Sequence, residues 1–507
     1  MKSKGMVYLV GAGPGDAQLL TLRAAELLGR ADVVVCDTPA NAEVCALAPR
    51  TAEFIGGASR ASQPAPAAAD LNQLLIAKAR EGKTVVRLID GDPFLFGSGG
   101  AEAEQLADAG VRFEVVPGVS AVLAGPSCAG VPLTHRGFAS QLTLMSGSAT
   151  PGAVDWDGLA TTPGTKIVTV SGEGLGAATQ ALLAKGLSAD TPAALVCRGA
   201  TGSQQSLEGT IGSITTLAAK ASIIGAATLI IGDVVKLREK LNWFERRPLF
   251  GQRIVVTRSR EQGGRLSGRL RELGAEVIEV PTIKFEPPEE KQSLVDALLE
   301  LNSYDWLVFT SPNGVTKFFE YFFKRFHDLR DLGGARIAAV GPATANKLKE
   351  LHLQVDLMPD EALASEIAKE FRKFESIENL KICLLRAEVA NPELPRALEE
   401  LGAIVDDVAV YRTVPEMEDV TGAAANLLEH GADWVAFTSG STVENFHARF
   451  ELPALLRKFP QLKTATIGPE TSKALTALGG KPTLEAKHHT LDGLVEALVS
   501  AHGPKSH

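Results

Sequence analysis

Residues 241–258, LNWFERRPLFGQRIVVTR, separate two series of strand–turn–helix units. The first series opens with VYLVGAGPGD at Val7, an apolar run that ends in a glycine-rich turn. The second opens with the β-branched run at residues 253–257, which also leads into a helical pattern. Strands that alternate with helices favour parallel sheets covered by helices. The sequence therefore predicts an α/β fold in two halves, with the boundary inside this stretch.

Length and charge narrow the class of protein. The chain has 507 residues, too many for one hydrophobic core, because single domains hold roughly 100–200 residues. Apolar residues make up 45% and charged residues 22% of the chain, as in ordinary globular proteins. The net charge of −9 comes without any block of Lys or Arg, so we expect no nucleic-acid partner. No apolar run reaches the ~18 residues of a membrane span, so we predict a cytoplasmic protein without a membrane partner.

The cysteines and histidines give no sign of a metal site. None of the five cysteines has CxxC spacing; they are Cys36, Cys45, Cys128, Cys197 and Cys383. The pair His488-His489 has no third candidate ligand near it in the sequence. We expect the cysteines to be small buried hydrophobic residues in a reducing compartment, and we expect no bound metal.

Three glycine-rich turns follow strands in the first half, at residues 11–16, 89–94 and 117–121. In open α/β sheets, ligands bind at the carboxyl ends of strands, where backbone N–H groups and helix N-termini are unpaired. We therefore expect the three loops to converge on one ligand site. A nicotinamide-dependent dehydrogenase is a weaker alternative, because the first loop contains Pro14 and lacks the G-x-G-x-x-G spacing.

Further motifs of the first half follow the order of a known family. They are VYLVGAGPGD, ADVVVCD, GDPFLFG, VVPGVSA, GVPLTHRG and LIIGDVVKLREKLNWFERRPLFG. This half resembles the tetrapyrrole methylases, and among them uroporphyrinogen-III C-methyltransferase. The resemblance implies a two-lobed α/β domain at residues 1–246 that binds S-adenosylmethionine between its lobes, and a homodimer through this domain. It also implies cofactor contacts at Pro14, Gly91, Asp92, Ser120 and Ala121.

Several residues depart from the pattern of that family. Ser98 stands where the family usually has Arg, and Ala101 replaces the first Glu of a pair. Residues 56–59 replace a common Lys-Arg, and residues 170–172 replace a Tyr-Met-Gly turn. Arg136 of the LTHRG motif is present, and the resemblance implies a catalytic role for it. Two interpretations stay open: a methylase that converts uroporphyrinogen III toward precorrin-2, or a degenerate domain that only binds cofactor or serves in docking and dimerisation.

The second half contains two pairs of similar turns. TSPNGV after Phe309 resembles TSGSTV after Phe437, and GPAT at residues 341–344 resembles GPET at residues 468–471. This repetition predicts two similar α/β lobes. The Ser and Thr side chains either cap the following helices or bind an anion together with the helix N-termini. The second role would let an acidic protein bind a polycarboxylate.

The motifs of the second half also follow a family order. They are IVVTR, VFTSPNGV, AAVGPATA, LRA, VYRTV, AFTSGSTVENF and TIGPETSKAL. This half, residues 247–507, resembles uroporphyrinogen-III synthase. The resemblance implies two flavodoxin-like lobes joined by a two-strand linker, with lobe one at residues 252–285 plus 415–500 and lobe two at residues 286–412. It also implies closure of hydroxymethylbilane to uroporphyrinogen III without a cofactor.

Within that resemblance, Tyr411 matches a cleft tyrosine whose phenol would donate a proton to the departing hydroxyl. An equal alternative is a strand-end tyrosine that packs at the hinge. Hydroxyls of the four turns are expected to bind carboxylates of the substrate; they belong to Thr310, Ser311, Thr344, Thr438, Ser439, Ser441 and Thr471. The two halves together predict a bifunctional enzyme of tetrapyrrole biosynthesis, in the sirohaem or cobalamin branch, with small-molecule tetrapyrrole substrates.

Overall fold

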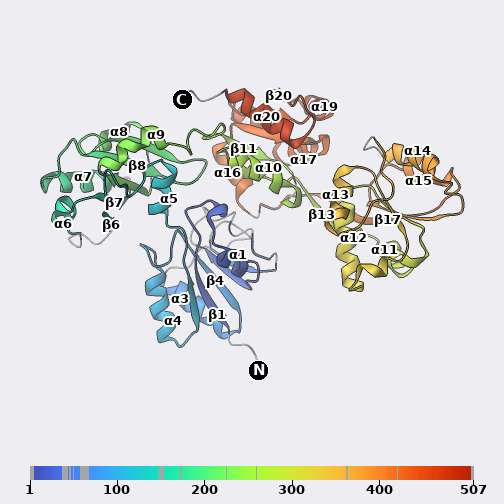
Figure 1. Cartoon of the computed structure of the whole chain (residues 1–507), viewed down its shortest axis with the longest axis horizontal. Helices are drawn as coiled ribbons and strands as arrows, with labels where there is room; N and C mark the ends of the chain where they lie inside the picture. Colours follow the sequence, from blue (N-terminus) through green and yellow to red (C-terminus); the bar gives the residue numbers. More distant parts are fainter. Residues whose placement is uncertain are drawn as a thin grey trace. The chain divides into compact units, whose positions relative to one another are not determined.

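The computed structural model describes residues 5–36, 44, 47–49, 51–56, 68–147, 154–171, 174–223, 225–258, 260–360, 364–419 and 421–503. The chain forms two compact units, Met1–Pro281 with Met417–His507, and Thr282–Glu416. In the described residues, four five-stranded sheets alternate with helices (Figure 1). The predicted α/β class is therefore confirmed.

The first sheet is parallel and has the strand order β3-β2-β4-β1-β5. Its strands are β1 (Met6–Gly11), β2 (Val33–Cys36), β3 (Glu53–Ile55), β4 (Thr84–Ile89) and β5 (Phe113–Val116), and its helices are α1 (Leu22–Leu28), α3 (Ala68–Arg80) and α4 (Gly99–Asp108). Successive residues of β1 pack on opposite faces: Leu9 packs with Leu75 of α3, and Val10 with Leu27 of α1. Because both faces are covered, these strands are continuously apolar.

The second sheet is mixed, in the order β6-β7-β10-β8-β9. Its strands are β6 (Leu142–Ser146), β7 (Thr165–Val170), β8 (Pro192–Cys197), β9 (Gln205–Thr210) and β10 (Ala227–Ile231). Helices α6 (Trp156–Thr161), α7 (Gly174–Ala184) and α8 (Ile214–Lys220) accompany it, and α5 (Ala121–Cys128) leads into it from the first sheet. Val122 and Ala129 pack against Ile167 and Ile230. The helix α5 therefore joins the two sheets into one two-lobed half.

The third sheet belongs to the same compact unit and is parallel, in the order β12-β11-β18-β19-β20. Its strands are β11 (Arg253–Val256), β12 (Glu276–Glu279), β18 (Trp434–Phe437), β19 (Lys463–Thr466) and β20 (Leu484–Glu485). Its helices are α10 (Arg260–Glu272), α16 (Ala423–His430), α17 (Gly440–Phe450), α18 (Leu452–Lys458), α19 (Pro469–Ala477) and α20 (Leu491–His502). Ile254 pairs with Trp434 across β11 and β18, so strands far apart in the sequence share one sheet.

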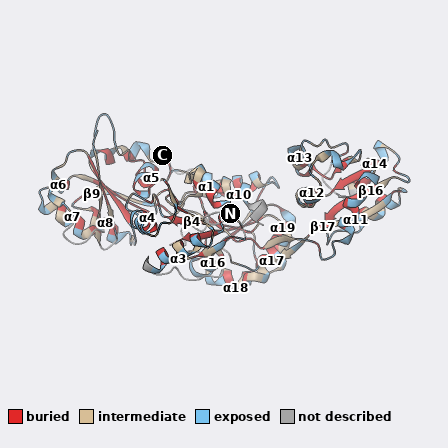
Figure 2. Cartoon of the chain, turned by 90° about the horizontal axis from the view of Figure 1, so that it is seen from below, coloured by how far each residue is buried: buried red, intermediate tan, exposed pale blue. Residues whose placement is uncertain are grey.

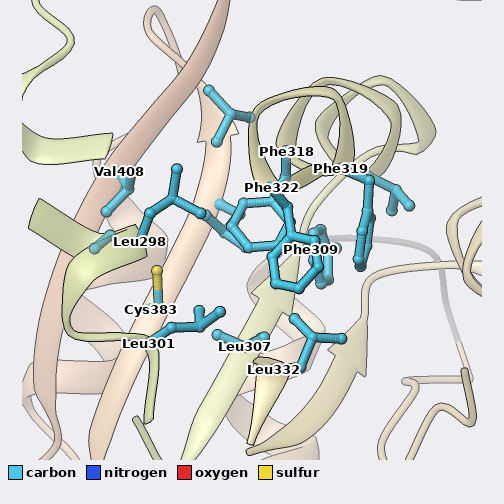
Figure 3. Close-up of a cluster of buried hydrophobic side chains, with 14 of the residues drawn as sticks. Leu298, Leu301, Leu307, Phe309, Phe318, Phe319, Phe322, Leu332, Cys383 and Val408 are labelled. Carbon is cyan, nitrogen blue, oxygen red and sulfur yellow. The ribbon is translucent and has the colours of Figure 1, made fainter. Parts of the chain in front are cut away.

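The fourth sheet makes up the second unit, in the order β13-β17-β16-β14-β15. Its strands are β13 (Ile283–Glu286), β14 (Trp306–Phe309), β15 (Arg336–Ala339), β16 (Lys381–Ala387) and β17 (Ile404–Pro415), and its helices are α11 (Gln292–Leu299), α12 (Pro312–Arg325), α13 (Pro342–Glu350), α14 (Ala364–Phe374) and α15 (Glu393–Glu399). Phe309, Phe318 and Phe322 fill the core beside Cys383 (Figure 3).

One boundary differs from the sequence analysis, which placed residues 252–285 in lobe one. Strand β13 pairs antiparallel with β17, with Ile283 opposite Pro415, and it lies in the second compact unit. The reason is physical, because β13 contributes an edge to the sheet that contains β17. Phe285 of β13 also contacts Tyr411 of that strand.

Burial follows the sheets, whose strands are largely buried while the helices alternate between buried and exposed residues (Figure 2). Cys36, Cys128, Cys197 and Cys383 are buried, which confirms the predicted burial of these four; Cys45 lies outside the described residues. In the part of the chain that the structure describes, no helix has the length and hydropathy of a membrane span.

Candidate functional sites

The three glycine-rich loops of the first half meet at the carboxyl edge of the first sheet. The N–H of Gly91 donates to the carbonyl oxygen of Gly13 at 2.9 Å, and the N–H of Gly13 donates to that of Gly91 at 3.3 Å. A Cβ atom on Gly118 would lie 2.1 Å from the carbonyl oxygen of Gly91, so the third loop can approach this closely only with glycine. The predicted convergence of the loops is confirmed.

Asp92 holds two of these loops together. Its carboxylate accepts hydrogen bonds from the N–H of Phe94 at 2.9 Å and from the N–H of Gly118 at 3.0 Å. It does not line the cavity described below. Asp92 therefore shapes the second and third loops, whereas the sequence analysis expected it to contact the cofactor.

A cavity of 1480 Å³ opens beside the loops. Of the predicted cofactor residues, Pro14, Gly91, Ser120 and Ala121 line it. Its other walls come from the second sheet (residues 169–171 and 196–203), from the connecting segment (Phe244 and Arg247) and from the start of the second half (residues 274–279). Sites for drug-sized ligands have roughly 300–1,000 Å³. The cavity has room for a nucleoside-sized cofactor and a second, larger molecule.

The helix α5 begins at this cavity. Its N-cap Ser120 makes no side-chain capping bond, and the N–H groups of Ala121 and Val122 have no hydrogen-bond acceptor within the described residues. Unpaired N–H groups at a helix N-terminus favour an anionic or carbonyl oxygen. A polar group of a small ligand would satisfy them.

Ser98, the departure from the methylase pattern, serves a buried ion pair. Its hydroxyl donates to Glu102 at 2.6 Å, and Glu102 accepts from both Nε and Nη2 of Arg87 at 3.0–3.3 Å. The side chains of Arg87 and Glu102 are 2% and 5% exposed. Ser98 does not line the cavity, so the start of α4 contributes no cation to it.

Arg136 is not brought to the cavity either. It lies in an exposed turn closed by the bridge between His135 and Ala139, and it is absent from the cavity lining. Of the other departures, Ser171 lines the cavity, while residues 57–59 and Gly172 lie outside the described residues.

Tyr411 lies on β17, opposite Ala387 at the carboxyl end of β16, and the strand order of the fourth sheet reverses between β16 and β14. It is 6% exposed, and its phenol oxygen lies 3.1 Å from the hydroxyl of Ser311. The Phe285 ring meets it edge-on at 5.3 Å. Such switch points are the usual ligand sites of open α/β sheets. Tyr411 is therefore a packed residue of the strand end, and it also lies beside a candidate ligand site.

Two of the four repeated turns are capped by their own serines. The hydroxyl of Ser311 accepts from the N–H of Gly314 at 3.0 Å at the start of α12. Ser439 and Thr442 form a reciprocal capping box at the start of α17, and Ser441 contacts Ser439 at 3.0 Å. The helix-capping interpretation is thus observed for these turns. Thr310 and Thr438, half-buried, precede the two serines.

The other two turns leave their helix N-termini without a cap. Helices α13 and α19 begin after Gly341 and Gly468, which have no side chain to accept a hydrogen bond. Thr344 and Thr471, at the third helical position, are each 3% exposed. In the described part of the chain, neither hydroxyl has a hydrogen-bond partner. Because both hydroxyls lie in the first turn of an uncapped helix, these two threonines are candidates for ligand contacts in the second half.

These features define a class: two fused α/β enzymes, one with a glycine-lined cavity and one with uncapped helix N-termini at the ends of its parallel strands. Residues 6–215 match the family model of Tetrapyrrole (Corrin/Porphyrin) Methylases, and residues 264–496 match that of Uroporphyrinogen-III synthase HemD. The Porphyrin biosynthesis protein HemD of Ruminiclostridium josui is 34% identical over 507 residues, 98% of each chain.

Two further proteins are also similar to this chain. The Uroporphyrinogen-III C-methyltransferase of Bacillus subtilis (strain 168) is 34% identical over 361 residues, 70% of this chain and 74% of that protein. The crystal structure of the uroporphyrin-III C-methyltransferase of Thermus thermophilus, complexed with S-adenyl homocysteine, is 35% identical, with a TM-score of 0.39 over 46% of this chain and 100% of that one. The chain belongs to the HemD porphyrin biosynthesis family, and in this chain a tetrapyrrole methylase domain precedes a uroporphyrinogen-III synthase domain.

Proposed function

We propose that the second half closes hydroxymethylbilane to uroporphyrinogen III and that the first half methylates this product with S-adenosylmethionine toward precorrin-2. The observation that supports the methylase activity is the cavity, which four of the five predicted cofactor residues line. The presence of both domains in one chain supports the pairing of the reactions, because the proposed product of the second half is the proposed substrate of the first half. The domain boundary near residue 246 and a homodimer through the first half belong to the same proposal.

S-adenosylmethionine fits the donors of the cavity. An oxygen of the cofactor would accept hydrogen bonds from the unpaired N–H groups at the start of α5. When bound, the cofactor supplies an electrophilic methyl group. Pro14 and Gly91 would bind and orient it, and the apolar residues around Ala121 would exclude water from it.

In the second half, the uncapped N-termini of α13 and α19 are proposed to bind carboxylates of the linear tetrapyrrole. Each presents backbone N–H groups, a positive helix end and the hydroxyl of Thr344 or Thr471. This lets a chain of net charge −9 bind a polyanion. The capping bonds of Ser311 and Ser439 give these residues, and their neighbours Thr310, Thr438 and Ser441, a supporting role in the same turns.

Tyr411 is proposed to assist departure of the substrate hydroxyl, which leaves as water when it gains a proton. The phenol is near the serine that caps α12, at 3.1 Å, and this contact orients the O–H group. The protein otherwise folds the linear substrate so that its ends approach each other. We therefore expect a large but incomplete loss of activity when Tyr411 is replaced by Phe.

A second candidate for the first half is a docking or cofactor-binding module without turnover. Two observations favour the docking module. Ser98 replaces the Arg of the family pattern, and Arg136 does not line the cavity, so neither position supplies a cation to it. Full-length protein given uroporphyrinogen III and methyl-labelled S-adenosylmethionine distinguishes the two. We expect label to enter the tetrapyrrole at a rate proportional to enzyme concentration. Cofactor binding without any labelled tetrapyrrole would contradict the methylase proposal and support the docking module.

A further inference from the structure

The segment that connects the halves is anchored on the first half at several points. The indole N–H of Trp243 donates to the carbonyl oxygen of Ser127 at 3.1 Å. Phe244 is 5% exposed and packs with Cys128, the last residue of α5, and with Ala200, which follows β8. Trp243 and Phe244 also meet edge-on at 5.4 Å. The connecting segment is therefore part of the folded first half.

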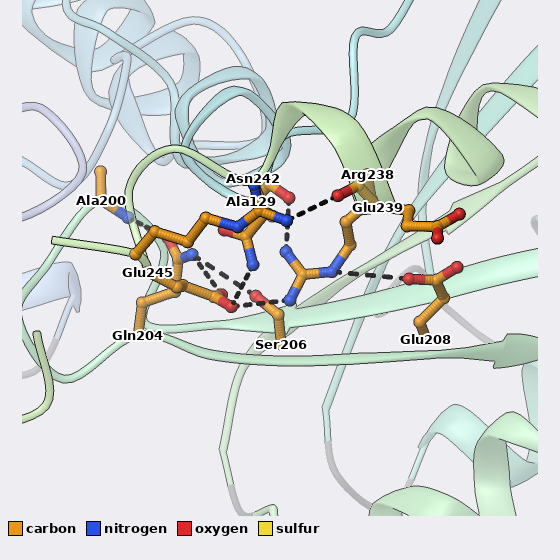
Figure 4. A network of polar contacts seen from close by, with 10 residues as sticks. Ala129, Ala200, Gln204, Ser206, Glu208, Arg238, Glu239, Asn242 and Glu245 are labelled. Carbon is orange, nitrogen blue, oxygen red and sulfur yellow. Dashed lines mark hydrogen bonds and ion pairs between the residues drawn. The ribbon is translucent and has the colours of Figure 1, made fainter. Parts of the chain in front are cut away.

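A polar network fixes the same segment from the other side (Figure 4). Glu245 accepts hydrogen bonds from Nη2 of Arg238 at 2.6 Å and from Nε2 of Gln204 at 2.8 Å. Gln204 in turn accepts from the N–H of Ala200 at 2.9 Å. Ala200 has a φ of 65°, a left-handed conformation that is strained for a non-glycine residue and that the surrounding structure must support. The network connects Glu245 to the strained loop that lines the cavity.

Arg247 is held at the cavity by this anchoring. Its guanidinium lies 4.7 Å from the centre of the Trp243 ring and 4.4 Å from that of Phe244, and it donates to the carbonyl oxygen of Arg271 at 3.5 Å. It lines the cavity and is half-buried. Among the described residues, no carboxylate lies within ion-pair distance of it. Arg271, which also lines the cavity, is already paired with Glu279 at 3.1 Å.

We propose that Arg247 binds a carboxylate of the tetrapyrrole substrate in the methylase cavity. This inference rests on the proposed function. The guanidinium fork matches a carboxylate in two hydrogen bonds, and stacking on two aromatic rings orients it before the substrate binds. Ser98 and Arg136 do not supply a cation there, and Asp16 and Asp90 line the same cavity. A cation from the connecting segment offsets the repulsion that these acidic groups would exert on the substrate.

The test compares Arg247→Gln with Arg246→Gln in the full-length protein. Arg246 is the matched control, because it is adjacent, exposed and donates only to the carbonyl oxygen of Glu239 among its described contacts. The KM for uroporphyrinogen III should rise about tenfold or more in Arg247→Gln and stay unchanged in Arg246→Gln. The dissociation constant for S-adenosylmethionine should be unchanged in both. Arg247→Lys keeps the positive charge but loses the planar guanidinium that makes two parallel hydrogen bonds. Its KM should therefore lie between those of wild type and Arg247→Gln.

Thermal unfolding separates an effect on binding from misfolding. If the Tm of Arg247→Gln is well below that of the wild type, the KM of Arg247→Lys is compared with that of the wild type instead. An unchanged KM in a folded variant, or an equal loss of cofactor binding, overturns the inference alone while the wild type still methylates. A wild-type protein that transfers no methyl group contradicts the proposed function, and this inference with it.

Discussion

Ser98 and Glu102 show how a family position can take a structural role. A side chain that the methylase pattern would place at the substrate instead completes the pair of Arg87 and Glu102. Sequence comparison predicts that a cation is missing there, but it does not predict where the serine hydroxyl goes. The serine hydroxyl bonds to Glu102 because Glu102 pairs with Arg87, a buried arginine between Val86 and Leu88 on β4.

Glu102→Gln should destabilise the first half strongly. The substitution leaves the buried guanidinium of Arg87 without a charged partner, and breaking such a pair costs about 3–5 kcal/mol. Urea denaturation, followed by circular dichroism, measures the loss of unfolding free energy in the transition that belongs to the first half. Glu104→Gln on the exposed face of the same helix is the control and should change stability by less than about 0.5 kcal/mol. Equal midpoints for the two variants would contradict the structural role of the pair.

Glu245 makes the attachment of the connecting segment depend on pH. Burial raises the pKa of Glu245, but hydrogen bonds from Ser206, Arg238 and Gln204 outweigh burial and lower that pKa below its ordinary value of 4.5. A carboxyl whose pKa is lower in the folded state stabilises above its unfolded pKa and loses this contribution as pH falls through the folded value. The stability difference between wild type and Glu245→Gln should thus be full above pH 4.5 and shrink below it. A difference that is constant across this range would show that the charge is not involved.

At the scale of elements, the four repeated turns were predictable from the sequence, but which of them have a capped helix N-terminus was not. The repeated motifs predicted strand–turn–helix units, because hydroxyl residues after an apolar run are typical of N-caps. They did not distinguish the turns capped by Ser311 and Ser439 from those that begin with Gly341 and Gly468. Only the side-chain contacts reveal which hydroxyls are unpaired.

Ser439→Ala should lower stability by about 1 kcal/mol, because it removes the hydrogen bond that the hydroxyl of Ser439 accepts from the N–H of Thr442 at 3.3 Å in the first turn of α17. Thermal or urea unfolding measures this loss, with Ser500→Ala as a surface control whose hydroxyl bonds only to the carbonyl oxygen of Glu496. A change in stability no larger than that of the control would mean that the cap contributes little.

Thr344→Val and Thr471→Val should act on binding instead. Valine keeps the shape and removes a hydroxyl that has no partner among the described residues, so stability should stay within about 0.5 kcal/mol. The KM for hydroxymethylbilane should rise about fivefold or more, because a hydrogen bond to a carboxylate is lost. Variants that keep the KM of wild type would remove these helix ends from the proposed binding site.

At the scale of the whole molecule, the α/β class and the two families were predictable because ordered motifs occur along nearly the whole sequence. The assignment of β13 to the second unit was not predictable, since β13 pairs with a strand that is distant in the sequence, with Ile283 opposite Pro415, and no local signal marks this pairing. Nor did the sequence reveal that Arg247, in a segment that reads as a linker, lines the cavity of the first half. Long-range packing determines both features, and local periodicity does not report it.

The central claim is that the second half converts a linear tetrapyrrole into the isomer with the inverted ring. The most direct measurement supplies full-length protein with hydroxymethylbilane, oxidises the products and separates the type I and type III isomers by chromatography. The account predicts a predominance of type III that grows with enzyme concentration. Only type I, the product of spontaneous closure, would contradict it.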